Sequence, residues 1–315
     1  MPTNLVRFEK GSVPHWGVVL QDGVAPLLGD YPTTADLIER GEADWREARK
    51  REPSLALKSL EILSPVTAPC RVFCQGANYR QHMIESGMDP DAKAFNMFFT
   101  KTDASISPAI GAVQRPEHVA LLDYEIELAL VFRRSIRAPV TVTAASLKDY
   151  VFGVAIANDL SARDVQLPQT QFFKGKSYRG FCPIGPWLTV LEPDEFGELD
   201  RLDLRLAVNG VTRQSDSTAN LVFKPAETIT ELSTFANISA GDVLLTGTPA
   251  GCALRVPPPA IRRIVQLLPE RQFWKLFLKS QSRRPQYLQP GDRINATIRS
   301  ADGRIDLGEQ VIKVA

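Results

Sequence analysis

The first part of the chain changes from an alternating pattern of apolar and polar residues to a helical one. Residues 4–28 contain three short alternating runs separated by turn-forming residues, and this pattern predicts three short β-strands. From residue 34 to residue 59, apolar residues recur at helical spacing among polar ones, which predicts helix. A segment containing Pro65 then marks a boundary. We therefore expect residues 1–66 to form a small α+β lobe and residues 67–315 to form the main domain.

One strand predicted in the main domain carries two acidic side chains on one face. In the stretch Asp123–Phe132, DYEIELALVF, side chains alternate at a period of two, so Glu125 and Glu127 lie on the same face. From Leu128 onwards both faces are apolar, as in a strand that is buried on both sides. The pattern therefore places two neighbouring carboxylates at the edge of an apolar interior.

Most other periodic segments of the main domain also predict strands. The apolar run 150–157 predicts a second buried strand, and the Asn-Gly pair at 209–210 joins two alternating segments into a β-hairpin. A short apolar strand leads through Gly76 into a predicted helix, and residues 226–235 predict another helix. The expected fold class is α+β and mainly β.

The segment 257–286 departs from this strand-rich pattern. Residues 260–268 and 269–281 form two amphipathic, basic stretches interrupted at Pro269, and they predict two helices. Three uses fit such helices: packing against the core, an oligomer interface, or contact with a membrane surface. Membrane contact is the least favoured, because strand patterns flank the segment and ordinary packing accounts for its apolar stripe.

Composition and charge exclude several classes of protein. The chain has 37 Lys and Arg residues against 36 Asp and Glu residues, a net charge of +1, and this balance gives no global field for nucleic-acid binding. The first 20 residues lack the continuous apolar run of a signal peptide, and no run of about 18 apolar residues occurs in the sequence, so we expect a cytoplasmic protein. Its four cysteines are too few and too scattered for a disulfide framework, and they lack zinc-site spacing.

Two like charges at the edge of an apolar interior are costly unless a cation is shared between them. Carboxylates without a nearby His or Cys favour a hard divalent ion such as Mg²⁺, Mn²⁺ or Ca²⁺. Asp159 stands where the second buried strand ends, at a place where a side chain is both fixed and accessible, and it is the third candidate ligand. The alternatives are two solvated glutamates on an edge strand and, for Asp159, a helix or turn cap.

Two pairs of polar residues stand at helical spacing near these candidates. His82 and Glu85 are three residues apart in a predicted helix, so the carboxylate can hold and stabilise the imidazole. An ordinary surface pair is the alternative. Arg163 and Gln166 follow Asp159 at helical spacing. An arginine can orient carboxylates there, and an amide can bind a substrate carbonyl or carboxylate.

Two further polar residues adjoin glycines. Lys176 follows Gly175 and is a candidate substrate anchor, although ordinary surface loops have the same composition. Thr248 lies in the turn 247–251, where its hydroxyl and nearby backbone N–H groups can bind an anion. A glycine turn alone is weak support, and the G-K-[ST] sequence of a Walker motif is absent.

Several motifs line up along the chain: GANYRQHMIESG, DYEIELALVF, NDLSARDVQ, GKSY, PIGPW, VNG, AGDVLLTGTPAG and a final PGD. Together they resemble the fumarylacetoacetate hydrolase family over about residues 65–315, and the N-terminal lobe is similar to that of bacterial members. The resemblance implies a mixed β-roll-like catalytic fold, a homodimer and bound Mg²⁺ or Mn²⁺. It also implies a set of roles: metal ligands Glu125, Glu127 and Asp159; a catalytic pair His82 and Glu85 on a mobile lid, with Lys176 at the reacting oxygens; and substrate-contacting or supporting residues Tyr79, Arg163, Gln166 and Thr248.

The sequence departs from the family pattern in two places. Tyr178 and Arg179 stand where the family usually has Phe-Asp, which adds a cation near the site, and the basic segment 257–286 intervenes before PGD. Both departures bear on the substrate more than on the chemistry.

The resemblance implies a small-molecule substrate, a 2-oxo acid or a 1,3-diketo acid. The expected activity is divalent-metal-dependent cleavage of a carbon–carbon bond in acylpyruvates, which yields pyruvate and a carboxylic acid, as in aromatic-compound catabolism. Oxaloacetate decarboxylation and isomerisation or hydration of 2-hydroxy-dienoates are alternatives that use the same enolate. A non-catalytic scaffold is a further alternative, but it would be expected to lack a ligand or the His–Glu pair, and all of these are present.

Overall fold

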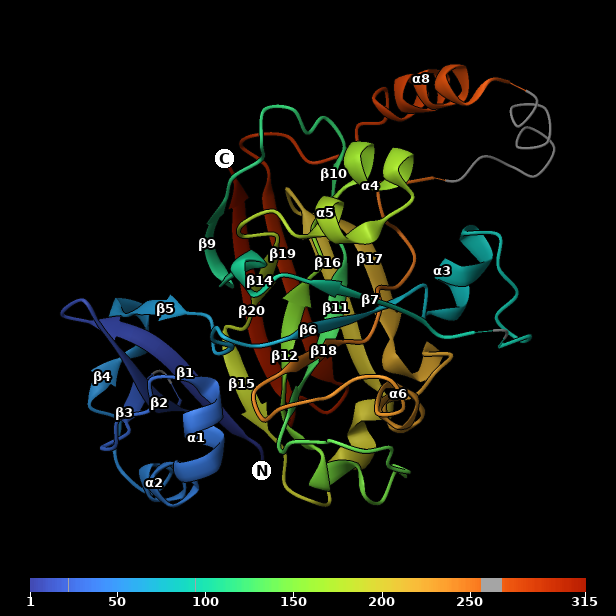
Figure 1. Ribbon diagram of the computed structural model, residues 1–315. Helices are drawn as coiled ribbons and strands as arrows, with labels where there is room; N and C mark the ends of the chain where they lie inside the picture. The colour runs from blue at the N-terminus through green and yellow to red at the C-terminus, as the bar shows by residue number, and fades with distance from the viewer. Residues whose placement is uncertain (22, 94, 256–267) are drawn as a thin grey trace.

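Strands dominate the computed structural model, which describes all residues except 22, 94 and 256–267 (Figure 1). Among the described residues, the strands form a 13-stranded sheet, a five-stranded sheet and a two-stranded sheet. The predicted fold class, α+β and mainly β, is therefore confirmed.

The N-terminal segment begins with the three predicted strands. β1 (Thr3–Lys10), β2 (Val13–Leu20) and β3 (Gly23–Pro26) pair in antiparallel order. α1 (Thr34–Arg40) then begins at a capping box between Thr33 and Asp36, which satisfies backbone N–H groups at the helix start. α2 (Glu42–Ala48) follows directly.

The prediction of helix over residues 34–59 is wrong in its second half. The helical segment ends at Ala48, and β4 (Leu55–Ala56), the 3₁₀ helix η1 (Leu57–Ser59) and β5 (Glu61–Leu63) follow. β4 pairs with β3, and β5 pairs with β1. Pairing with existing strands thus overrides the local helical spacing, and Pro53 cannot donate the backbone hydrogen bond that a continuing helix needs.

The large sheet continues from the N-terminal strands into the rest of the protein, because β1 pairs antiparallel with β15. The order along its main path is β4-β3-β2-β1-β15-β12-β11-β18-β6-β7. The boundary at residue 66 stays a prediction. The bounds of the remaining strands of this sheet are β6 (Val72–Gly76), β7 (Met97–Lys101), β8 (Ile106–Pro108), β11 (Ile126–Phe132), β12 (Val151–Asn158), β14 (Cys182–Ile184), β15 (Trp187–Val190) and β18 (Val243–Leu245).

The acidic stretch 123–132 is divided between two sheets. Every residue of β11 is buried, which confirms a strand covered on both faces. Its N-terminal part differs from the prediction, because β10 (Leu122–Asp123) pairs with β13 (Ser161–Ala162) as a separate ribbon. Glu125 therefore lies in the connection between β10 and β11, one residue before the strand.

The five-stranded sheet has the order β17-β16-β19-β20-β9. Asn209 and Gly210, with φ of 51° and 78°, form the turn of the predicted hairpin, which is confirmed because a type I′ turn needs positive φ at both positions. Side chains of this sheet and of β11 belong to one hydrophobic core. The bounds are β9 (Ile110–Val113), β16 (Leu202–Val208), β17 (Val211–Ser217), β19 (Arg293–Ser300) and β20 (Asp306–Val314).

Short helices connect and cover the strands (Figure 1). The helices predicted after Gly76 and over residues 226–235 are confirmed as α3 and α6, although α6 ends at Leu232. The bounds are α3 (Arg80–Glu85), α4 (Arg163–Gln169), α5 (Phe172–Lys176), α6 (Pro225–Leu232), η2 (Asp103–Ser105), η3 (Leu147–Asp149), η4 (Phe196–Asp200) and η5 (Thr218–Asn220).

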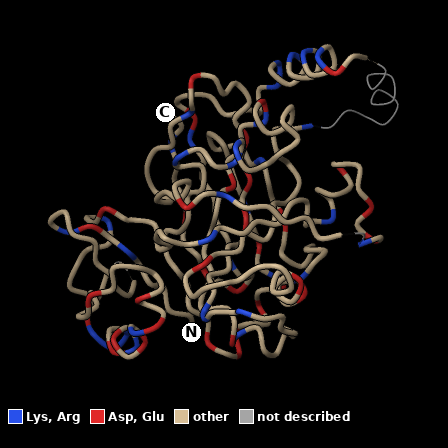
Figure 2. Tube along the Cα trace, viewed as in Figure 1, with Lys and Arg blue, Asp and Glu red and all other residues tan. Residues whose placement is uncertain are grey.

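The basic segment contains α8 (Glu270–Gln281), which confirms the second helix predicted there. Figure 2 shows several Lys and Arg residues along this helix and few acidic ones. The first predicted helix, over residues 260–268, falls almost entirely outside the described residues and stays a prediction. Within the described part of the chain, no helix is both long enough and apolar enough to cross a bilayer.

Candidate active site

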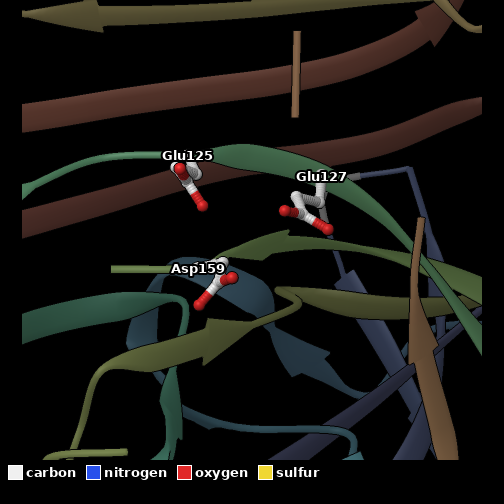
Figure 3. Close-up of side chains that lie close together, drawn as sticks. All are labelled: Glu125, Glu127 and Asp159. Atoms are coloured by element: carbon white, nitrogen blue, oxygen red, sulfur yellow. The ribbon is translucent and has the colours of Figure 1, made fainter. Parts of the chain in front are cut away.

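The three candidate metal ligands converge in the structure. The carboxylates of Glu125, Glu127 and Asp159 are buried, and one oxygen from each lies within 4.8 Å of the others. Figure 3 shows the three side chains directed toward a common space. The antiparallel pairing of β11 with β12 sets Ile126 opposite Asn158, and this register brings Asp159 beside the two glutamates.

Each of the three carboxylates has at least one oxygen held by a neighbouring donor. The Gly247 N–H donates to Glu127 Oε2 at 2.7 Å, the Arg163 guanidinium donates to Glu125 Oε1, and Lys101 Nζ donates to Asp159 Oδ1 at 2.5 Å. Donors of this kind fix the orientation of ligand side chains in metal sites.

A buried cluster of carboxylate oxygens, with no His or Cys in the cluster, fits a hard divalent cation. The residues present therefore fit Mg²⁺ or Mn²⁺, and Glu125, Glu127 and Asp159 are the side chains that would hold it. Lys176 also reaches this cluster. Its Nζ donates to Glu125 Oε2 at 2.6 Å and to Asp159 Oδ2 at 2.5 Å.

The electrostatic environment sets the ionisation of these groups. Burial, together with the charges of Asp159 and Glu125, raises the pKa of Glu127 well above its usual range. Burial also acts to raise the pKa of Glu125, but Arg163 and Lys176 outweigh it, so that pKa lies below the usual range. Burial acts to lower the pKa of Lys176, and Asp159 and Glu125 outweigh it, so the pKa is raised and the ammonium stays protonated.

A cavity of about 190 Å³ adjoins the carboxylates. His82 reaches it from α3, and burial lowers the pKa of His82, so its imidazole is neutral at pH 7 and able to accept a proton. Predicted site residues that line the same cavity are Arg163, Gln166, Lys176 and Thr248, and apolar residues that line it include Met88, Met97, Phe99, Leu167, Phe172 and Leu254.

Some predicted site residues do not take their expected contacts. Glu85 is exposed, and within the described chain it forms no hydrogen bond or ion pair with His82. Tyr79 is buried, is not among the residues that line the cavity, and has no hydrogen-bond partner for its hydroxyl among the described residues. The Thr248 hydroxyl donates to Ile126 O at 3.0 Å. It also accepts from Gln214 Nε2 at 2.8 Å, so its hydrogen is directed away from the cavity.

The sequence analysis missed three buried polar residues that support the site. Lys101 holds Asp159 and also donates to Phe181 O at 2.8 Å. Gln214 donates to Thr248 and accepts from the Ile126 N–H at 3.0 Å. Asp123 accepts from Arg163 Nε at 2.9 Å. Of these three residues, only Asp123 could have been singled out from the sequence, because it is the first residue of the acidic stretch 123–132.

A mainly β fold with a buried carboxylate triad beside a cavity defines the type of site in which an enzyme can hold a hard divalent ion next to a small molecule. Residues 71–315 match the family described as "Fumarylacetoacetate (FAA) hydrolase C-terminal". The chain belongs to the fumarylacetoacetate hydrolase family, whose members are metal-dependent hydrolases, isomerases or tautomerases.

Two curated relatives are similar over most of the chain. The oxaloacetate tautomerase YisK of Bacillus subtilis (strain 168) is 37% identical over 228 residues, which cover 70% of this chain and 73% of the relative. The mitochondrial oxaloacetate tautomerase FAHD2A of Bos taurus is 34% identical over 269 residues, which cover 81% of this chain and 83% of the relative.

Two solved structures match nearly the whole chain. The fumarylacetoacetate hydrolase of Exiguobacterium antarcticum superposes with a TM-score of 0.72 at 29% identity and covers 99% of both chains. The maleylpyruvate hydrolase of Sphingobium sp. SYK-6, in complex with manganese (II) ion and pyruvate, superposes with a TM-score of 0.72 at 25% identity and covers 99% of this chain and 98% of its own.

Proposed function

We propose that this protein catalyses keto–enol proton transfer on a small 2-oxo acid, with Mg²⁺ or Mn²⁺ held by Glu125, Glu127 and Asp159. One observation carries the proposal: the Lys176 ammonium lies 2.6 and 2.5 Å from Glu125 and Asp159 in a cavity that His82 also lines. The two tautomerases among its relatives support oxaloacetate as the first substrate to test.

The side chains divide the work of proton transfer between them. A bound divalent ion would polarise the keto oxygen of the substrate and favour the enolate. The neutral His82 imidazole accepts a proton from carbon 3, and the Lys176 ammonium stabilises the negative charge that develops on the oxygen. The His82 imidazolium then returns the proton to that oxygen, which gives the enol and a neutral imidazole, and the same steps in reverse convert the enol to the keto form. With its ammonium paired to Glu125 and Asp159, Lys176 supplies the positive charge in this proposal, and His82 supplies the base.

Arg163 and Gln166 orient the substrate in this proposal. Arg163 Nη1 donates to Gln166 Oε1 at 2.9 Å, so the amide nitrogen of Gln166 is left to bind a substrate oxygen. Tyr79 and Thr248 as substrate contacts, and Glu85 as the partner of His82, stay predictions.

Hydrolysis of acylpyruvates is the second candidate, favoured by the similarity to the maleylpyruvate hydrolase that holds manganese and pyruvate. In that reaction His82 would take a proton from water, and the hydroxide would add to the distal carbonyl. The carbon–carbon bond would then break to give a carboxylic acid and pyruvate enolate, which is protonated to pyruvate. Hydrolysis needs an oriented water as well as a base, whereas tautomerisation only moves a proton within the substrate, and for that reason hydrolysis is the second candidate.

A substrate panel separates these reactions. Loss of the enol absorbance of oxaloacetate, accelerated by Mg²⁺ or Mn²⁺ and abolished by chelator, is the expected result. Pyruvate release from acetylpyruvate or fumarylpyruvate would instead establish the hydrolase, and pyruvate release from oxaloacetate would establish a decarboxylase. No metal-dependent change in any of the three would refute the proposal.

Assembly is proposed separately. We infer a homodimer from the family resemblance, and light scattering after size exclusion tests it, with a monomer mass as the result that would refute it. The cytoplasmic location stays a prediction.

A further inference from the structure

We propose that Asp123 is a positioning residue of the active site, which fixes the Arg163 guanidinium and, through it, the amide of Gln166. The inference rests on the proposed function, because it assigns Asp123 an indirect role in binding the 2-oxo acid. Asp123 is wholly buried and is not among the residues that line the cavity. Any effect it has on the substrate must therefore act through its neighbours.

The Arg163 guanidinium divides its nitrogens among three partners. Nε donates to Asp123 Oδ2 at 2.9 Å, Nη1 donates to Gln166 Oε1 at 2.9 Å, and Nη2 donates to Glu125. A guanidinium is planar and rigid, so fixing one edge fixes the direction of the others. Asp123 thus determines where Arg163 holds the amide of Gln166.

Asp123 also holds one wall of the cavity. Its carboxylate accepts from the Ala253 N–H at 2.7 Å and from the Leu254 N–H at 3.0 Å, and Leu254 lines the cavity. The same segment is tied to the end of α8, because Gln281 Nε2 donates to Arg255 O at 3.0 Å. The Asp123 carboxylate therefore links Arg163 to residues 253–255, which lie just before the basic segment 257–286.

The substitution Asp123→Asn tests this role with little change in shape. Each oxygen of the Asp123 carboxylate accepts from at least two donors. In Asn, one of these oxygens becomes an N–H₂ group. This group faces donors in either orientation of the amide and displaces one of them. We expect kcat/KM for oxaloacetate to fall about 100-fold, the scale for a displacement of about 1 Å at a site. Most of this loss should come from a rise in KM. The Mn²⁺ dissociation constant should stay close to that of the wild type, because the metal ligands keep their other hydrogen-bond partners.

Asp242 provides a matched control. It is also a buried aspartate that accepts from two backbone N–H groups, those of Arg71 and Ser239 at 2.7 Å each, and pairs with the Arg71 guanidinium at 3.1 Å. It lies at the other end of β11, where Asp242 O accepts from the Phe132 N–H. Asp242→Asn should therefore place an amide among the same kinds of donor as Asp123→Asn does, but without a rise in KM.

A double variant keeps the test valid if Asp123→Asn alone does not fold. Asp123→Asn combined with Arg163→Met removes both charges of this pair, so neither partner is left as an unpaired buried charge, and Glu125 still accepts from Lys176. If Asp123 acts through Arg163, the double variant has the KM of Arg163→Met alone, whereas a further multiplicative rise would overturn the proposal.

Three other results are decisive. A wild-type KM in folded Asp123→Asn, or an equal rise in KM in Asp242→Asn, would overturn the role of Asp123. Calorimetric titration of the Mn²⁺-loaded wild type with pyruvate tests the proposed function separately. If the wild type binds no pyruvate and acts on no 2-oxo acid, the proposed function itself fails, and this outcome is distinct from a failure of the inference about Asp123.

Discussion

Replacing Lys101 with Met should destabilise the protein strongly although the residue lies on an ordinary sheet strand. The Lys101 side chain is completely buried. Its ammonium donates to Asp159 Oδ1 at 2.5 Å and to Phe181 O at 2.8 Å. Methionine has a similar length and leaves little cavity, so the loss comes from the polar contacts.

The magnitude follows from what the substitution leaves behind. Removing one partner of a buried ion pair costs about 3–5 kcal/mol, because the remaining charge is uncompensated. Asp159 retains Lys176 at 2.5 Å, which limits the ion-pair loss, and the Phe181 carbonyl still accepts from the Leu160 N–H at 3.1 Å, so the loss of its bond to Lys101 adds little. We therefore expect a loss of about 3–5 kcal/mol out of a total stability of about 5–15 kcal/mol.

Thermal and urea unfolding in the presence of chelator measure this loss. The entropy of unfolding increases with chain length, and for 315 residues a loss of about 1 kcal/mol lowers Tm by about 1.5 °C. The expected decrease in Tm is therefore about 5–8 °C. Lys224→Met is the control, because Lys224 Nζ donates to Thr218 O and Ala219 O at 3.0 Å but its side chain is 35% exposed. A loss of about 1 kcal/mol or less is expected there.

The pair Lys101→Met with Asp159→Asn isolates the cause. Removing both charged partners leaves no orphaned charge, so the double variant should be less destabilised than the two single losses added together. If Lys101→Met alone costs no more than Lys224→Met, or if the two losses simply add, the reasoning about a buried charge beside Asp159 is refuted.

Three other predictions concern the metal and the base. Glu125→Ala should abolish Mn²⁺ binding in a calorimetric titration, and a normal affinity would remove Glu125 from the ligands. His82→Ala should lose turnover on both oxaloacetate and acylpyruvates while it binds Mn²⁺ normally, with the surface variant His118→Ala as its control; undiminished turnover would exclude His82 as the base. Mn²⁺ affinity should rise with pH, because the raised pKa of Glu127 favours its protonated form and the ion must displace that proton. Titrations in buffers of different ionisation enthalpy should report this proton release, and its absence would refute the raised pKa.

Features that depend on local period and turn chemistry could be predicted from the amino-acid sequence. The alternation in DYEIE places Glu125 and Glu127 on one face, the apolar run that follows predicts a strand buried on both sides, and Asn209-Gly210 predicts its hairpin. The ordered motifs were enough to identify the family. These signals are local, since each depends on residues a few positions apart.

Which distant groups meet could not be predicted in this way, because it depends on the fold. The pairing of β3 with β4 replaced a helix that the local spacing favoured, because pairing along a sheet outweighs a weak intrinsic preference. Lys101 gives no signal in the sequence, since a lysine on a strand is ordinarily exposed. It becomes a buried support of the site only because the fold brings it beside Asp159, 58 positions away in the chain. Asp123, Arg163 and Leu254 likewise meet only in the folded protein, because a carboxylate takes donors from whatever backbone and side chains the fold places around it.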